Sequence, residues 1–302
     1  MDNAIVLDNV TKTYRNKWWR SFQALSGVNL QVHCGEAFGF VGPNGAGKST
    51  AIKILVGVNR ATTGRAYLLG RDVEHHQARC GVAYVPESPY LYDYLTPMEV
   101  LTMGVRLHHV AVSDIRAYCL AWLARFRIEH VADKRIRQFS KGMVQRTALA
   151  HALACQPKLL ILDEPLSGLD PVGRRETVEL LRDYHHQGGT LFFSSHVLHD
   201  VESLADRFGL IHQGCIKTIQ TQQQLVEQHG TYQLSFKAPT AIIAQATRLG
   251  NELWQVEASQ EQLWAVLAAV REQGGELREV KPTMNLEKIF FEVIHQPQGN
   301  SP

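Results

Sequence analysis

The stretch FGFVGPNGAGKST at residues 38–50 passes from an apolar run through a glycine-rich turn into a helical pattern. Its second part fits GxxxxGK[ST], in which glycines let backbone N–H groups converge on phosphate oxygens. Lys48 is placed to reach the β- and γ-phosphates, and the Ser49 hydroxyl is placed for Mg²⁺. The positive end of the following helix faces the same anion. We therefore expect a nucleotide at Gly42, Pro43, Asn44, Gly45, Ala46, Gly47, Lys48, Ser49 and Thr50.

A second motif, LLILDE at residues 159–164, is an apolar strand that ends in two carboxylates. A carboxylate at a strand tip beside a phosphate loop can hold Mg²⁺, so Asp163 is the predicted metal residue together with Ser49. The adjacent Glu164 can orient or deprotonate an attacking water. The two motifs together predict a P-loop nucleoside triphosphatase.

Outward from these motifs, the chain alternates strands and helices, which is typical of an α/β fold. Residues 4–14 and 24–41 read as strands, and Thr96-Pro97-Met98-Glu99 has the residues of a capped helix start. The segment 96–138 looks all-helical. Further helices are expected at 140–155, 171–187 and 197–205, and further strands at 159–162, 190–194, 207–211 and 215–219.

The polar stretch QTQQQ at residues 220–224 marks a change in the sequence pattern at about residue 222, and a smaller α/β region follows. Its expected strands are 231–238, 253–258 and 276–281, and its expected helices are 240–249, 260–273 and 285–294. We predict a first domain over 1–222, a C-terminal α/β domain over 223–295 and a disordered tail over 296–302.

The composition is that of an ordinary folded protein: 302 residues, 45% hydrophobic, 20% charged and a net charge of +2. It argues against wholesale disorder and gives no electrostatic case for nucleic-acid binding. The longest apolar run, Leu263 to Val270, is too short to span a bilayer. The first residues lack the features of a signal peptide. The five cysteines form no CxxC pair and are expected to be free thiols in a reducing cytosol.

Several further motifs resemble those of ATP-binding-cassette (ABC) proteins, in the family's order. Phe139 to Arg146 resembles the signature motif, Tyr84 to Glu87 the Q-loop, and Ser167 to Asp170 the D-loop. Ser195-His196 is similar to the switch histidine, and Tyr14 to the aromatic of the A-loop. The resemblance covers about residues 3–220. It implies a RecA-like core with an antiparallel β subdomain and an inserted helical subdomain, about 96–138.

The resemblance implies that each nucleotide lies between two cassettes arranged head to tail, so the expected partner is a second, identical cassette. Ser140 and Gly142 of one cassette would reach the γ-phosphate held by the other, and Asp170 would join the site from the D-loop. His196 would bond the γ-phosphate as a neutral imidazole and act in catalysis with Lys48 and Glu164. Tyr14 would stack on adenine; the alternative is an exposed tyrosine at a strand end.

Two departures from the common pattern resemble the ABC-2 exporter branch: Lys141 and Met143 in the signature, and Glu87 in the Q-loop, where glutamine is commoner. Glu87 is expected near Mg²⁺ and the nucleotide. The end of the chain, 282–290, is similar to endings in that branch. The basic and aromatic stretch 15–20 suits a membrane interface or a hairpin tip.

The expected function is therefore the cytoplasmic ATPase subunit of an exporter, with ATP and Mg²⁺, peripheral on the inner face of the cell membrane. A separate permease would dock near Glu87 and residues 88–95, where Tyr90, Tyr92 and Tyr94 form a socket or pack as an ordinary loop. The alternatives are an importer subunit, a soluble ABC protein acting on ribosomes or nucleic acid, and a non-hydrolysing regulatory cassette.

Overall fold

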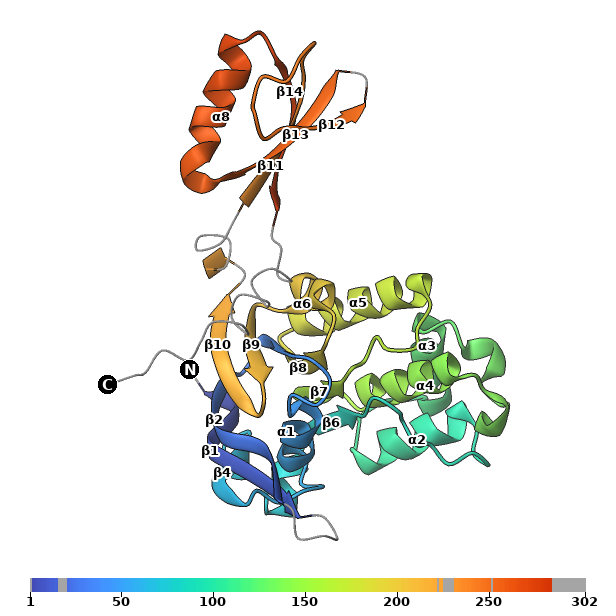
Figure 1. Cartoon of the computed structure of the whole chain (residues 1–302). Helices are drawn as coiled ribbons and strands as arrows, with labels where there is room; N and C mark the ends of the chain where they lie inside the picture. The colour runs from blue at the N-terminus through green and yellow to red at the C-terminus, as the bar shows by residue number, and fades with distance from the viewer. Residues whose placement is uncertain (1, 16–20, 222, 225–230, 251, 284–302) are drawn as a thin grey trace. The chain divides into compact units, whose positions relative to one another are not determined.

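The computed structural model describes residues 2–15, 21–221, 223–224, 231–250 and 252–283 (Figure 1). Contacts divide the chain into two compact units, Met1–Ile219 and Gln220–Pro302. Most of the loop at 15–20, the expected helix at 285–294 and the expected tail at 296–302 lie outside the described residues. Within them, no helix is both long and apolar enough to cross a membrane.

The first unit opens with an antiparallel sheet in the order β2-β1-β4-β5. Its strands are β1 (Asn3–Arg15), β2 (Ser21–His33), β4 (Thr63–Leu68) and β5 (Arg71–Asp72). The single strand expected over 24–41 is wrong: β2 ends at His33, and β3 (Ala37–Val41) belongs to another sheet. The chain turns between them at Gly35, whose φ of 77° is a conformation that favours glycine.

The second sheet has the order β10-β9-β3-β8-β7-β6, and its strands from β9 to β6 are parallel. Besides β3 it contains β6 (Val82–Val85), β7 (Leu159–Asp163), β8 (Thr190–Ser195), β9 (Arg207–His212) and β10 (Cys215–Thr221). Every residue of β3, β7 and β8 is buried. Continuous apolar runs such as FGFV and LLIL form these strands because both faces of the sheet are covered.

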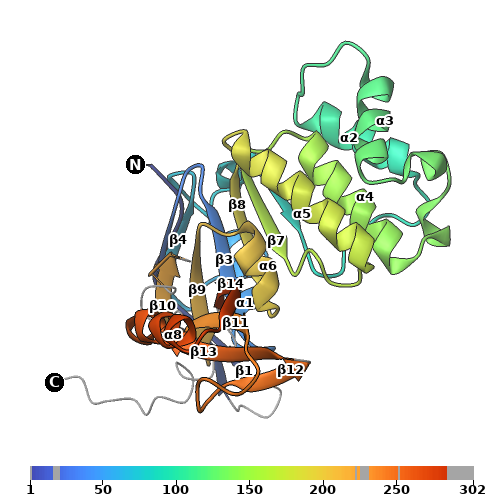
Figure 2. The same cartoon turned by 90° about the horizontal axis from the view of Figure 1, so that it is seen from above.

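The described helices of the first unit connect parallel strands, except α1, which leads from β3 to β4 of the antiparallel sheet. They are α1 (Lys48–Leu55), α2 (Pro97–Leu107), α3 (Ile115–Arg125), α4 (Lys141–Ala154), α5 (Pro171–His186) and α6 (Leu198–Leu204). The start predicted at Thr96 is confirmed as a capping box with Glu99. In the predicted helical segment, α2 and α3 are followed by short 3₁₀ turns at Glu129–Val131 and Ile136–Gln138. Helices α2 and α3 lie at one end of the unit, packed against α4 (Figure 2).

The main core of the first unit lies between the antiparallel sheet, α1 and the central parallel strands. Phe38 and Phe192 stack there with ring centroids 5.9 Å apart, and both side chains are fully buried. Burying one such ring stabilises the fold by about 1.5–3 kcal/mol. The phosphate loop begins directly after β3, so this core fixes the strand from which the loop starts.

The second unit is a four-stranded antiparallel sheet, β12-β13-β11-β14, with one described long helix. Its elements are β11 (Thr231–Lys237), β12 (Thr247–Gly250), β13 (Leu253–Ser259), α8 (Gln260–Glu272) and β14 (Glu276–Thr283). Strand β11 pairs with both β13 and β14, so β13-α8-β14 forms a split βαβ unit around it.

The helix expected over 240–249 is wrong. Residues 239–246 form turns and bends, and Thr247–Gly250 is strand β12, which pairs with β13. Ile242 and Ile243, consecutive in the sequence, both pack on the core of this unit. Tertiary packing and strand pairing therefore override the helical pattern of the segment.

Candidate functional site

The phosphate loop connects β3 to α1 through glycines that the backbone requires. Gly47 has a φ of 112°. A Cβ atom placed there would lie 2.7 Å from the Ala24 carbonyl oxygen, and one at Gly42 would collide with the Ile211 carbonyl oxygen. Gly42 N donates to the Ser195 carbonyl oxygen at 3.4 Å, which ties the loop to the end of β8. Side chains at these glycines would therefore displace the loop.

Lys48 is the first residue of α1 and is 5% exposed. Its Nζ donates to the carbonyl oxygens of Gly42 at 2.6 Å and Pro43 at 3.3 Å. The same nitrogen lies 3.3 Å from Glu164 Oε1, an ion pair without hydrogen-bond geometry. An anion that enters the site would compete with Glu164 for this buried cation.

Hydroxyl and carboxylate oxygens meet at the ends of β7 and β8. Ser49 Oγ donates to Asp163 Oδ1 at 3.2 Å, and Ser194 Oγ donates to the same oxygen at 2.6 Å. The Glu164 N–H in turn donates to Ser194 Oγ at 3.0 Å. Sequence reasoning missed Ser194; the available signal was a hydroxyl at the end of an apolar strand that neighbours LLILD.

These oxygens are ligands that Mg²⁺ prefers. Among the described residues, however, no group of three or more His, Cys, Asp or Glu side chains could hold a metal by itself. Ser49 and Asp163 therefore fit a Mg²⁺ ion that takes its other ligands from phosphate oxygens and water, which is how this ion is usually bound beside a nucleotide.

Glu164 follows Asp163 at the tip of β7 and is 8% exposed. Its Oε2 lies 2.8 Å from His196 Nδ1, while Oε1 faces Lys48. Because an ionised carboxylate only accepts, Nδ1 carries the proton of a neutral His196 and leaves Nε2 as an acceptor. A buried carboxylate between a lysine and a histidine has the surroundings of a general base.

One cavity of about 410 Å³ brings most of the predicted site residues together. Its lining comprises residues 43–50 of the phosphate loop together with Glu87, Glu164, His196, Ala24 and Phe22. Asp163 lies behind it, reached through Ser49. Sequence reasoning missed Phe22, an exposed side chain on β2 directly opposite Tyr14 on β1.

Tyr14, Ser140, Gly142 and Asp170 are not among the residues that line this cavity. The Tyr14 hydroxyl accepts a hydrogen bond from Asn59 Nδ2 at 2.9 Å. Ser140 is the exposed N-cap of α4, Gly142 lies in its first turn, and Asp170 is the N-cap of α5. In a single chain, Ser140, Gly142 and Asp170 therefore lie away from the phosphate loop.

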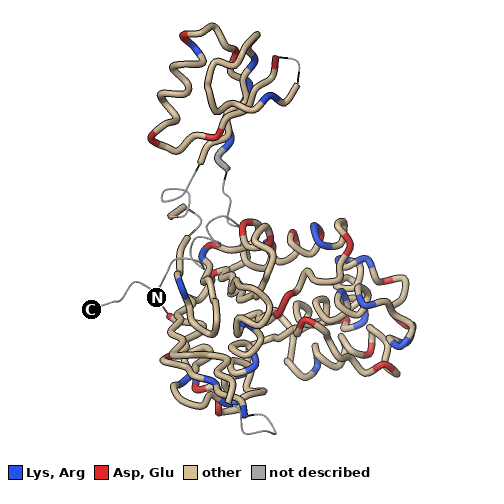
Figure 3. Tube along the Cα trace, in the orientation of Figure 1, with Lys and Arg blue, Asp and Glu red and all other residues tan. Residues whose placement is uncertain are grey.

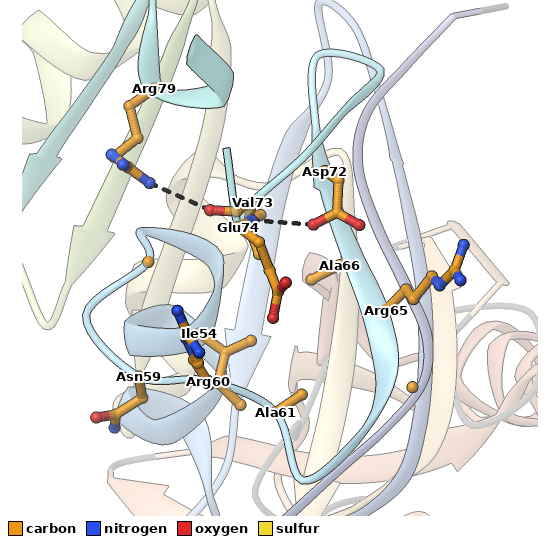
Figure 4. A pocket seen from close by; sticks show the side chains of 12 residues that line it. Ile54, Asn59, Arg60, Ala61, Arg65, Ala66, Asp72, Val73, Glu74 and Arg79 are labelled. Atoms are coloured by element: carbon orange, nitrogen blue, oxygen red, sulfur yellow. Dashed lines mark hydrogen bonds between the residues drawn. The ribbon is translucent and has the colours of Figure 1, made fainter. Parts of the chain in front are cut away.

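A separate cavity of about 430 Å³ lies between the end of α1 and strands β4 and β5 (Figure 4). Its polar groups partly satisfy one another: Arg79 Nη1 donates to the Val73 carbonyl oxygen at 3.2 Å, and the Glu74 N–H donates to Asp72 Oδ1 at 2.9 Å. None of residues 42–50 lines it, so it is distinct from the candidate nucleotide site.

Comparison with known proteins identifies a family and its fold. The profile of the ABC transporter family matches residues 25–167. An ABC transporter ATP-binding protein of Nostoc is 33% identical over 97% of this chain and 90% of its own length. The Nod factor export ATP-binding protein I of Rhizobium meliloti is 37% identical over 70% of this chain and 62% of its own length.

One further relative bears on the direction of transport, and one solved structure bears on how cassettes assemble. The sulfate/thiosulfate import ATP-binding protein CysA of Nephroselmis olivacea is 32% identical over 76% of this chain and 66% of its own length. A dimeric ATP-binding cassette solved in a post-hydrolysis state with ADP and Pi is 25% identical, with a TM-score of 0.67, over 72% of this chain and 98% of that one.

Proposed function

This chain belongs to the ABC transporter family, and from that premise we propose that it is the ATP-binding and ATP-hydrolysing subunit of an exporter whose membrane-spanning permease is a separate protein. The observation that carries the proposal is the convergence of Lys48, Glu164 and His196 on one cavity beside the phosphate loop. A lysine that binds the phosphates and a carboxylate that can position or deprotonate water are groups that hydrolysis of a nucleoside triphosphate uses.

ATP and Mg²⁺ fit the residues that line and back this cavity. The N–H groups of the loop and Lys48 Nζ would hold the phosphates, and Ser49 and Asp163 would hold Mg²⁺ with Glu87 at the rim. Bound Mg²⁺ neutralises charge on the phosphate oxygens. Tyr14 or its neighbour Phe22 would stack on adenine, since the two rings lie on adjacent strands at the edge of the site.

Glu164 would accept the proton of the attacking water. His196 would orient Glu164 by donating from Nδ1 or, in the tautomer with the proton on Nε2, would donate to a γ-phosphate oxygen. In the described structure Lys48 is paired with Glu164. An arriving phosphate competes for the lysine, which frees Glu164 for the water. The presence of Lys48, Asp163, Glu164 and His196 argues against a non-hydrolysing regulatory cassette.

The site is completed by a second cassette. Ser140, Gly142 and Asp170 lie away from the cavity, at or beside the N-termini of α4 and α5. In a head-to-tail pair, the α4 N-terminus of one copy would face the γ-phosphate held by the other, as helix N-termini do toward anions. The likeness to a dimeric cassette supports this arrangement.

Export is the favoured direction because Glu87, Lys141 and Met143 are variants that resemble the exporter branch. The Nod factor export protein supports it at 37% identity, while the importer relative is 32% identical. An importer subunit remains the second candidate. Action on nucleic acid is disfavoured, since acidic and basic residues are interspersed along the described chain (Figure 3).

The permease would dock near Glu87 and residues 88–95, where Tyr90 is 94% exposed and Tyr92 and Tyr94 stack loosely on each other. This interface would keep the chain in the cytoplasm, peripheral on the inner face of the cell membrane. The region 223–295 would be an accessory domain of this subunit.

The test is Glu164→Gln in the purified chain. The amide can still hold a water but cannot accept its proton, so hydrolysis should fall about 100-fold or more while ATP binding persists. Trapped ATP should then hold two copies together, which light scattering detects. Glu179→Gln, at an exposed position of α5, is the matched control and should keep the parental rate. Near-parental hydrolysis in Glu164→Gln would remove Glu164 from this role.

A further inference from the structure

The turn from Ser195 to Val197, which carries His196, is closed by a hydrogen bond between its first and last residues. His196 lies between β8 and α6, and 48% of its side chain is exposed, yet its Nδ1 meets Glu164 at 2.8 Å. The preceding Ser195 is 2% exposed. Its Oγ accepts a hydrogen bond from Val197 N at 2.9 Å, which closes the turn around His196. The position of the imidazole therefore depends on what holds Ser195.

A second contact of the Ser195 hydroxyl is made by Asp200 on α6. The Asp200 carboxylate is buried, and its Oδ2 accepts from Ser195 Oγ at 3.1 Å. The hydroxyl has one hydrogen and a second acceptor, the Val197 carbonyl oxygen at 3.0 Å. A charged acceptor binds such a hydrogen more strongly than a carbonyl does. Asp200 therefore anchors the hydroxyl that closes the turn.

Arg174 neutralises this buried carboxylate from a third element, α5. Its Nε donates to Asp200 Oδ1 at 3.0 Å, and its Nη2 contacts the same oxygen. Arg174 lies four residues after Asp170, the N-cap of α5. A continuous set of contacts therefore runs from the first turn of α5 through Asp200 and Ser195 to the backbone on both sides of His196.

We propose that Arg174 and Asp200 form a positioning pair that holds the Ser195–Val197 turn, and thereby keeps the His196 imidazole against Glu164. The inference rests on the proposed function, because it gives the pair a task in the hydrolysis performed at that site. Neither side chain lines the nucleotide cavity, so both act through His196. A change in the first turn of α5 is thereby transmitted to the histidine.

The test separates positioning from folding by replacing the whole pair. In Arg174→Met/Asp200→Leu no charge is left buried and unpaired, so the fold should persist, while the anchor of Ser195 is lost. The kcat for ATP should fall about 10- to 100-fold, with KM within about twofold of the parent, because the contacts of the phosphate loop are untouched. Arg175→Met, at the exposed neighbouring arginine, should leave both constants unchanged.

A second readout does not depend on turnover. The side-chain nitrogen signals of His196, assigned with His196→Gln, should shift or broaden in the double variant and stay in place in Arg175→Met. Should the double variant fail to fold, Asp200→Asn carries both measurements, because it removes the charge and keeps the size. Parental kcat, or unmoved His196 signals, in a folded variant would overturn the inference.

Results that would contradict the proposed function differ from those that would contradict the positioning pair. If the parent chain binds ATP and hydrolyses none, or hydrolyses it as fast with Gln at position 164, then the catalytic assignment is wrong, whatever the His196 signals show. If the parent hydrolyses ATP through Glu164 while the pair variants keep its kcat, only the positioning role is lost.

Discussion

At the scale of single residues, Glu164 combines features that a structural carboxylate rarely has together. Its φ of 50° is a left-handed conformation, which costs a non-glycine residue about 1–3 kcal/mol. Its Oε1 is buried without a hydrogen-bond partner in the described structure. The Lys48 ammonium, 3.3 Å away, compensates the charge of this oxygen, so the strained backbone is the unfavourable feature, and such strain is tolerated where the geometry serves a reaction.

A second residue-scale effect concerns pH. Burial, with a smaller contribution from His108, lowers the pKa of His151 on α4 from its ordinary value of 6.5. As pH falls through about 6.5 the unfolded chain takes up this proton before the folded chain does, so folding stability declines. We expect the free energy of unfolding to drop between pH 7.5 and 5.5 by up to about 1.4 kcal/mol per pH unit more than in His151→Gln.

Urea unfolding at several pH values measures this difference. His130→Gln, at an exposed position, is the control and should keep the parental pH dependence. Equal pH dependence in the parent and in His151→Gln would show that His151 takes up its proton equally well in the folded and unfolded chains.

At the scale of elements, α2 approaches α4 at a position where only glycine fits. A Cβ atom at Gly104 would collide with the His151 imidazole and lie 2.9 Å from Cys155 Sγ. Alanine is the better helix former by about 1 kcal/mol, but overpacking costs about 1–3 kcal/mol. The difference leaves a net cost, and we expect Gly104→Ala to destabilise the chain by up to about 2 kcal/mol in urea unfolding.

The contact itself can be tested by removing the other partner. Adding His151→Ala to Gly104→Ala should recover much of the loss relative to His151→Ala alone, since the imidazole is then absent. Met103→Ala, on an exposed part of the same helix, controls for helix propensity. Full additivity of the two changes would mean that α2 and α4 do not meet at Gly104.

At the scale of the whole molecule, the proposed site needs two copies of the chain, because Lys48 and Ser140 belong to different parts of the cassette. Ser140→Arg should leave ATP binding by the single chain intact and stop turnover, since a bulky cation would block the partner's γ-phosphate. Lys48→Ala should also be inactive. Mixing the two variants should restore part of the hydrolysis, because mixed pairs contain one site with Lys48 and Ser140 both intact.

The measurement is the ATPase rate across mixing ratios, with mixed pairs verified by differently tagged chains. Each variant assayed without the other is the control. Failure of verified mixed pairs to hydrolyse ATP would argue that a working site draws both residues from one chain or that both sites must be intact.

The sequence alone was sufficient wherever the determining interactions are local. The phosphate loop is specified by glycines within nine residues, and the start of α2 by Thr96 and Glu99, three residues apart. Apolar runs identified β3 and β7, because a strand buried on both faces must be apolar throughout. The family resemblance followed from such short motifs and their order.

What only the tertiary structure decided depends on residues far apart in the chain. The two sheets divide at Gly35, and Thr247–Gly250 becomes a strand because β13 lies beside it. Ser194 beside Asp163, Phe22 at the cavity, and Arg174 with Asp200 all depend on which elements are neighbours. Pairing and burial between distant segments supply that information, and no local pattern of side chains encodes which neighbour each segment will meet.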